Sequence, residues 1–137
     1  RDFCLSRGLG DVYKRQIEFR PATPQIADHY REAAIYVMSS RYEGLPMVLI
    51  EAKCFGLPSV SFDCPNGPDE IIRHDTDGLL VTSGDVEGLA AALRRLMTDR
   101  KLIRQFGKAA NNDAQQRFNR ENVIMQWEQL LTKITSR

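Results

Sequence analysis

The chain has 137 residues, of which 42% are hydrophobic and 8% aromatic, and its formal net charge at pH 7 is +1. This is the size of one domain, and the composition excludes collagenous and disordered proteins. A nearly neutral chain favours no nucleic-acid partner, and no apolar run reaches the roughly 18 residues of a transmembrane segment. The 3 cysteines have no metal-binding or disulfide spacing, so they predict neither a metal site nor a disulfide framework.

Residues 1–16 do not resemble the rest of the chain. Residues 6–16 can be back-translated into DNA that resembles a transposon-based sequencing adapter read in frame. We therefore interpret residues 1–16 as translated adapter and not as native protein, with a natural basic arm as the alternative. Residues 17–137 are then the truncated part of a longer protein.

The next part of the chain alternates between strands and helices. Proline at a helix start and glycine after a helix end set several of the boundaries, as at Pro46, Pro68 and Gly56. The predicted elements are a strand at 17–19, a helix at 25–33, a strand at 34–38, a loop at 39–45, a helix at 46–55, a strand at 59–62, a short helix from Pro68 and a strand at 79–81.

Three helices are predicted after residue 85, the last of them capped by Asn119. We expect their apolar stripes to be packing faces, with Trp127 in a core; contact of Trp127 with a missing domain is the alternative. The stripes are Val86, Leu89, Ala90, Leu93, Leu96 and Met97; Leu102, Ile103, Phe106 and Ala110; and Val123, Ile124, Trp127, Leu130, Leu131 and Ile134.

This alternation predicts an α/β fold, a Rossmann-like parallel sheet with helices on both faces, ending in helices. Ligands of such sheets bind at the carboxyl ends of the strands. Two loops leave strands there, at residues 39–45 and 63–67. The chemistry is therefore expected in these two loops.

The first loop has features of a phosphate site. Gly44 removes a side chain just before a helix, and the backbone N–H groups of Leu45, Met47 and Val48 lie where a first helical turn leaves donors without intrahelical partners. A diphosphate could be held by these donors and by the helix dipole.

Glu43 and Glu51 flank this helix start. Carboxylates beside a diphosphate make sense if they accept hydrogen bonds from hydroxyls, as a ribose or a sugar would supply. The spacing therefore suggests a nucleotide-sugar. Two alternatives stay open: Glu43 as a solubilising loop residue, and Glu51 as a solvated helix residue.

The segment 39–52, followed by Gly-Leu-Pro at 56–58 and by residues 62–72, resembles the donor-binding domain of GT-B glycosyltransferases. More narrowly, it is similar to the retaining family 4 group, and the resemblance runs from residue 17 to the end. It implies that residues 17–137 are the C-terminal, donor-binding half of such an enzyme, truncated at its N-terminus. Asp-Gly-Leu-Leu-Val at 77–81 also fits this family.

The resemblance implies roles for matching positions. Glu43 would be the catalytic residue beside the donor sugar, and Glu51 would bind the ribose. The other implied donor-binding residues are Gly44, Leu45, Met47, Val48, Ser40, Arg41, Asn66 and Gly67. The implied donor is a UDP-sugar, with a GDP-sugar as the alternative, and the resemblance implies no metal and no cofactor.

The implied reaction transfers a hexose or N-acetylhexosamine to a glycan or lipid-linked acceptor. The acceptor would be bound by a missing N-terminal domain, so the isolated fragment is expected to be inactive. The implied location is the cytoplasm, at the inner face of the membrane through that missing domain. A non-catalytic nucleotide-binding α/β module is the alternative reading. A dinucleotide-dependent oxidoreductase is disfavoured, because residues 17–137 lack Gly-x-Gly-x-x-Gly.

Overall fold

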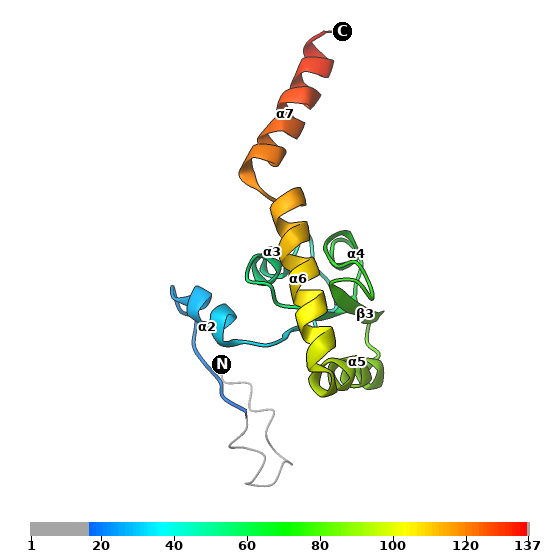
Figure 1. Cartoon of the computed structure of the whole chain (residues 1–137). Helices are drawn as coiled ribbons and strands as arrows, with labels where there is room; N and C mark the ends of the chain where they lie inside the picture. The colour runs from blue at the N-terminus through cyan, green and yellow to red at the C-terminus, as the bar shows by residue number, and fades with distance from the viewer. Residues whose placement is uncertain (1–16, 137) are drawn as a thin grey trace.

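The computed structural model describes residues 17–136, which form a parallel three-stranded sheet flanked by helices (Figure 1). The elements are α2 (Ile26–Glu32), β1 (Tyr36–Met38), α3 (Met47–Cys54), β2 (Ser59–Asp63), α4 (Pro68–Ile71), β3 (Gly78–Thr82), α5 (Val86–Thr98), α6 (Arg100–Arg117) and α7 (Arg120–Thr135). The strand order is β1-β2-β3, and Val60 lies opposite both Val37 and Leu79. The predicted α/β fold class is confirmed. The interpretation of residues 1–16 lies outside the described residues.

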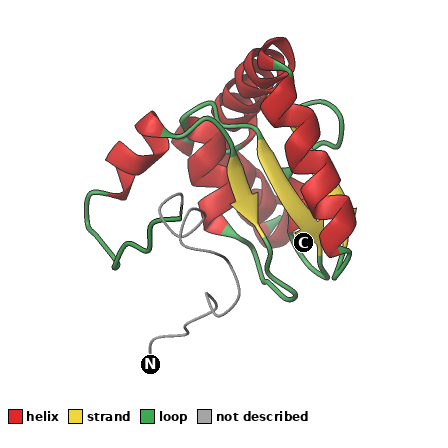
Figure 2. Cartoon of the chain, turned by 90° about the horizontal axis from the view of Figure 1, so that it is seen from below, coloured by secondary structure: helices red, strands yellow, loops and turns green. Residues whose placement is uncertain are grey.

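The two faces of the sheet carry separate hydrophobic clusters, because successive strand residues point to opposite sides. Figure 2 shows helices on either side of the strands. One cluster joins β1 to α3 and α4, and consists of Met38, Leu49, Ile50, Ile71 and Ile72. The other joins β2 and β3 to α5 and α6, and consists of Val60, Leu79, Leu96 and Phe106. Each fully buried Leu or Ile side chain contributes roughly 1.5–3 kcal/mol.

Two strand predictions need correction. Residues 17–19 form no strand: Ile17 and Phe19 are exposed, and no strand of the described chain pairs with them. A strand is stabilised by hydrogen bonds to a neighbouring strand, which residues 17–19 do not form within the described chain. The strand predicted at 34–38 begins only at Tyr36, where pairing with β2 begins.

The helix boundaries agree closely with prediction. Gly56 adopts the left-handed φ of 72° predicted after α3, and Asn119 caps α7 by accepting from the backbone N–H of Asn122 at 2.7 Å. Pro68 is at the start of α4, as predicted. Pro46 is the N-cap of α3 and not its first residue, because its ψ of 88° lies outside the helical range.

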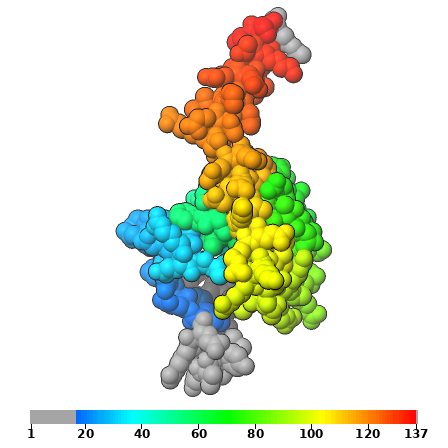
Figure 3. Space-filling model, viewed as in Figure 1, coloured from blue at the N-terminus to red at the C-terminus, as the bar shows by residue number. Residues whose placement is uncertain are grey.

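The last helix, α7, extends away from the rest of the molecule (Figure 1, Figure 3). None of its residues is buried, and Trp127 is 60% exposed. The predictions of a packed face and of a core Trp127 are therefore wrong. Helical spacing establishes that a helix has an apolar face, but it does not establish what covers that face. Between residues 17 and 136, no helix is both long and apolar enough to span a membrane.

A buried ionic cluster joins α3 to α6 and to the start of β3. Lys53 Nζ lies 2.6 Å from Asp113 Oδ2 and 3.1 Å from Asp77 Oδ2, and all three side chains are at most 1% exposed. Two half-exposed arginines complete the cluster: Arg73 Nε lies 2.8 Å from Asp77, and Arg117 lies 3.3 Å from Asp113. The cluster holds α3, which carries the predicted site, against the long helix α6.

Candidate functional site

The two predicted loops meet at a pair of glycines. Gly67 has a φ of 122°, and a Cβ built on it would overlap the carbonyl oxygen of Gly44 and the Cδ of Pro46. Only glycine fits this position, because both the backbone conformation and the space exclude a side chain. The contact brings the loop after β1 and the loop after β2 together beside the N-terminus of α3.

Within residues 17–136, the first backbone N–H groups of α3 have no hydrogen-bond partner. Leu49 N–H donates to Pro46 O at 2.9 Å, so the first intrahelical bond begins there, and the N–H groups of Met47 and Val48 precede it. Met47 and Val48 are exposed, and nothing lies within 4 Å of a Cβ built on Gly44. An anion could therefore approach this end of the helix.

The charges of Glu43 and Glu51 both affect the pKa of the Tyr36 phenol. Burial is the main cause that raises the pKa of Tyr36, and the charges of Glu51 and Glu43 raise it further. Glu43 lies in the loop and Glu51 on α3, one turn after Met47. Both carboxylates are thus near enough to the Tyr36 phenol to affect its pKa.

Sequence reasoning missed a direct partner of Glu51. The phenol of Tyr30 on α2 donates a hydrogen bond to Glu51 Oε2 at 3.0 Å. Tyr30 is 5% exposed, whereas Glu51 is exposed. The two residues are 21 positions apart, and no spacing rule links them. The only signal in the sequence was a tyrosine within a short predicted helix. Such a residue is more often interpreted as part of the core.

The remaining predicted residues border these loops. Leu45 and Arg41 are exposed, and Ser40 is half-buried. Asn66 is exposed with a left-handed φ of 64°, which turns the chain into Gly67. No hydrogen bond links the side chains of Ser40, Arg41 or Asn66 to Glu43 or Glu51 within the described chain.

A hollow of about 620 Å³ lies beside the second loop, at the carboxyl ends of β2 and β3. Its lining consists of Asp63, Pro65, His74, Leu80, Val81, Thr82 and Ser83. Neither Glu43 nor Glu51 lines this hollow. In residues 17–136, no three His, Cys, Asp or Glu side chains cluster in a way that could hold a metal ion.

Comparison with known proteins finds one matching family and several relatives. The sequence model of the family described as "Glycosyl transferases group 1" matches residues 12–113. The chain is 39% identical over 134 residues to an exopolysaccharide phosphotransferase of Streptomyces coelicolor, covering 97% of this chain and 14% of that protein. It is 41% identical over 108 residues to an amylovoran biosynthesis glycosyltransferase of Erwinia amylovora, covering 78% of this chain and 30% of that one.

A solved structure shares the fold. The Anabaena protein HepE in complex with UDP superimposes with a TM-score of 0.79 at 22% identity, covering 90% of this chain and 33% of that chain. The chain thus spans one third or less of the length of each of these three proteins.

Proposed function

Because the chain belongs to the family of group 1 glycosyl transferases, we propose that it is the donor-binding part of a retaining enzyme of the family 4 group. The complete protein transfers a hexose or N-acetylhexosamine from a nucleoside-diphosphate sugar to a glycan or lipid-linked acceptor. The relative from Erwinia amylovora, named for amylovoran biosynthesis, supports a role in polysaccharide assembly.

One observation carries the proposal: the exposed N-terminus of α3 lies beside the contact between Gly44 and Gly67, with Glu43 on the loop before it and Glu51 on the helix itself. The diphosphate binds to the backbone N–H groups at Leu45, Met47 and Val48, which the helix dipole makes favourable for an anion. Gly44 admits the diphosphate because it has no side chain. Ser40, Arg41, Asn66 and Gly67 border the bound donor.

The two glutamates act on different parts of the donor. Glu51 accepts hydrogen bonds from the ribose hydroxyls, since a carboxylate has room for two donors. Glu43, on the loop before the helix, lies beside the donor sugar at the reaction centre. The acceptor hydroxyl attacks the anomeric carbon on the face from which the diphosphate departs. The departing diphosphate takes the hydroxyl proton, and the start of α3 stabilises its growing charge.

We propose a UDP-sugar as the donor, with a GDP-sugar as the alternative. The binding of UDP by HepE supports this choice. The acceptor-binding domain lies outside this chain in the proposed enzyme, so we expect residues 1–137 to bind nucleotide without transferring sugar. The proposed location of the complete enzyme is the cytoplasmic face of the membrane.

An NMR titration of the chain with UDP tests the site. We expect shifts at residues 43–51 and 66–67, and we expect Glu51→Ala to raise the UDP concentration that is needed to produce them. Glu128→Ala, which removes an exposed carboxylate on α7, is the control and leaves the shifts unchanged. If Glu51→Ala binds UDP as the unaltered chain does, the ribose assignment is wrong.

The released nucleotide identifies the reaction of the complete protein. Sugar transfer breaks the bond between the anomeric carbon and oxygen, which releases UDP from a UDP-sugar. Transfer of a sugar phosphate breaks a phosphorus–oxygen bond and releases UMP, and the Streptomyces relative named a phosphotransferase makes this comparison informative. We expect UDP. Binding without either product supports the alternative, a non-catalytic nucleotide-binding module.

A further inference from the structure

Tyr30 connects the short helix α2 to the proposed ribose-binding carboxylate. It is the one buried residue of α2, and its hydroxyl donates to Glu51 Oε2 at 3.0 Å. Glu51 is an exposed residue, so its charge is presented to solvent while one of its oxygens is bonded to a buried phenol. One oxygen of the carboxylate, Oε2, is therefore hydrogen-bonded to Tyr30, and the other, Oε1, is available to a ligand.

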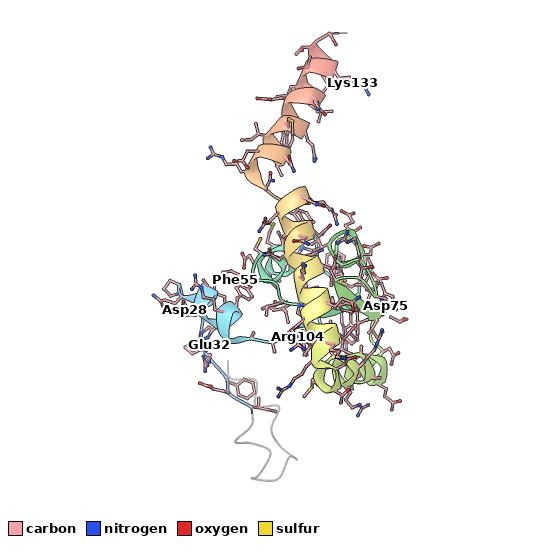
Figure 4. All side chains as sticks on the ribbon, viewed as in Figure 1. Asp28, Glu32, Phe55, Asp75, Arg104 and Lys133 are labelled. Carbon is pink, nitrogen blue, oxygen red and sulfur yellow. The ribbon has the colours of Figure 1, made fainter. Side chains whose placement is uncertain are left out.

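Aromatic packing fixes the position of the phenol. The ring of Tyr30 stacks on Phe55 with centroids 5.3 Å apart and planes at 26°, and it lies 6.0 Å from the ring of Tyr36. The guanidinium of Arg31 lies 5.4 Å from the Phe55 ring centroid. Figure 4 shows Phe55 close to α2, where Asp28 is labelled. The hydroxyl is therefore aimed at Glu51 from a rigid support.

We propose that Tyr30 is a positioning residue that holds Oε2 of Glu51, leaving Oε1 for the ribose, and thereby makes the site prefer ribonucleotides over 2′-deoxyribonucleotides. This inference rests on the proposed function. A carboxylate held in one orientation accepts from both adjacent ribose hydroxyls without losing rotamer freedom on binding. A freely rotating carboxylate loses rotamer freedom when the nucleotide binds. It therefore discriminates less between a 2′-deoxyribose, which has one hydroxyl, and a ribose, which has two.

The protonation state of the phenol suits this role. Burial is the largest cause that raises the pKa of Tyr30, and the hydrogen bond to Glu51 and its charge raise it further. The phenol therefore stays protonated at neutral pH and remains a donor. A phenol that ionised would repel Glu51 and release it.

Nucleotide affinities measured by calorimetry test the inference on the whole chain. The probes are UDP and 2′-deoxy-UDP, and the quantity of interest is the ratio of their dissociation constants. We expect the unaltered chain to bind UDP about tenfold more tightly, the effect of one hydrogen bond to a charged group. Tyr30→Phe removes only the hydroxyl. We expect it to weaken the binding of UDP and to bring the ratio of dissociation constants close to one.

The ratio separates positioning from a structural role. A partly unfolded variant binds both nucleotides more weakly by the same factor, so the ratio of their dissociation constants stays unchanged. Tyr36→Phe removes a neighbouring phenol that donates to no side chain in the described part of the protein, and we expect it to keep the ratio of the unaltered chain.

Glu51→Ala separates failure of the inference from failure of the proposed function. One outcome is that Glu51→Ala brings the ratio of dissociation constants to one while Tyr30→Phe keeps the ratio of the unaltered chain. In that case Tyr30 does not position the carboxylate, and only the inference is wrong. If the unaltered chain does not distinguish the two nucleotides, or if Glu51→Ala retains the ratio, the ribose assignment and the inference are both wrong.

Discussion

Lys53 and Asp113 are 60 residues apart in the chain and form a buried ion pair at 2.6 Å. Lys53 lies two residues after Glu51 on α3, and Asp113 lies on α6. A buried charge without a partner is costly, so each of these groups depends on the other. The pair fixes the helix that carries the proposed ribose-binding residue.

Removing Lys53 should therefore destabilise the fold strongly. In Lys53→Met, Asp77 and Asp113 lose their buried cation, and we expect a loss of about 3–5 kcal/mol in the free energy of unfolding by urea denaturation. Arg95→Met breaks the Arg95–Asp75 pair, in which both side chains are 51% exposed, and should cost less than about 1 kcal/mol. Equal losses in the two variants would contradict the structural role of the buried cluster.

The two glycines at the loop contact should respond differently to alanine. At Gly44 nothing obstructs a Cβ, so Gly44→Ala should change stability by less than about 1 kcal/mol. We nevertheless expect this variant to bind UDP more weakly, because the methyl group occupies space proposed for the diphosphate. Gly67→Ala places a methyl group on the Gly44 carbonyl and should cost about 2 kcal/mol or more.

Gly84→Ala supplies the control for these variants. Gly84 has a φ of 85° with open space around it, so this variant isolates the backbone strain without an overlap. Urea denaturation and UDP titration of all three variants complete the comparison. A Gly44→Ala chain with unchanged UDP affinity would remove Gly44 from the diphosphate site.

Alkaline pH should destabilise the chain through Tyr30. In the folded state the pKa of Tyr30 is raised, whereas an unfolded tyrosine ionises near pH 10. The stabilisation is complete below pH 10 and is lost as pH rises towards the folded-state pKa, because only the unfolded chain releases the proton. Between pH 9 and 11, we expect Tyr30→Phe to lose about 1 kcal/mol less than the unaltered chain.

Urea denaturation at these two pH values measures the difference. Tyr36 titrates in both proteins, so it cancels in the comparison. Parallel losses in the two proteins would mean that Tyr30 ionises normally in the folded state.

Trp127 provides a spectroscopic report on α7, since the chain has 1 tryptophan. At low concentration, its fluorescence should be solvent-like and readily quenched by acrylamide. The exposed apolar stripe of α7 should associate at high concentration and shift the emission to the blue. Leu131→Lys should suppress this shift, whereas Gln129→Lys should leave it in place. Emission that does not depend on concentration would contradict self-association through the stripe.

The fold could be predicted from local patterns. Apolar runs of strand length, proline at helix starts and Gly56 after α3 all report on neighbouring residues, and they located most elements within a few positions. The resemblance to the C-terminal domain of GT-B glycosyltransferases is confirmed at the level of the group 1 family and of the fold. The exposed position of Trp127 could not be predicted, because it depends on what lies opposite α7.

Two parts of the site environment depend on contacts between distant residues. The Tyr30–Glu51 bond and the Lys53–Asp113 pair join residues 21 and 60 positions apart, and no periodicity in the sequence links them. Lys53 in particular lies where a helix pattern alone allows a solvated side chain, yet it is 1% exposed. The individual roles of the predicted site residues stay predictions, because they depend on a bound donor.

The contact between Gly44 and Gly67 also limits how this surface can be redesigned. A side chain at Gly67 would overlap the carbonyl of Gly44 and the ring of Pro46, so the two loops cannot change conformation independently at this point. In the proposed enzyme, exchanging donor preference with a relative would require both loops to be transplanted as one unit. Exposed residues that make no part of the glycine contact, such as Arg41, are the safer place to begin.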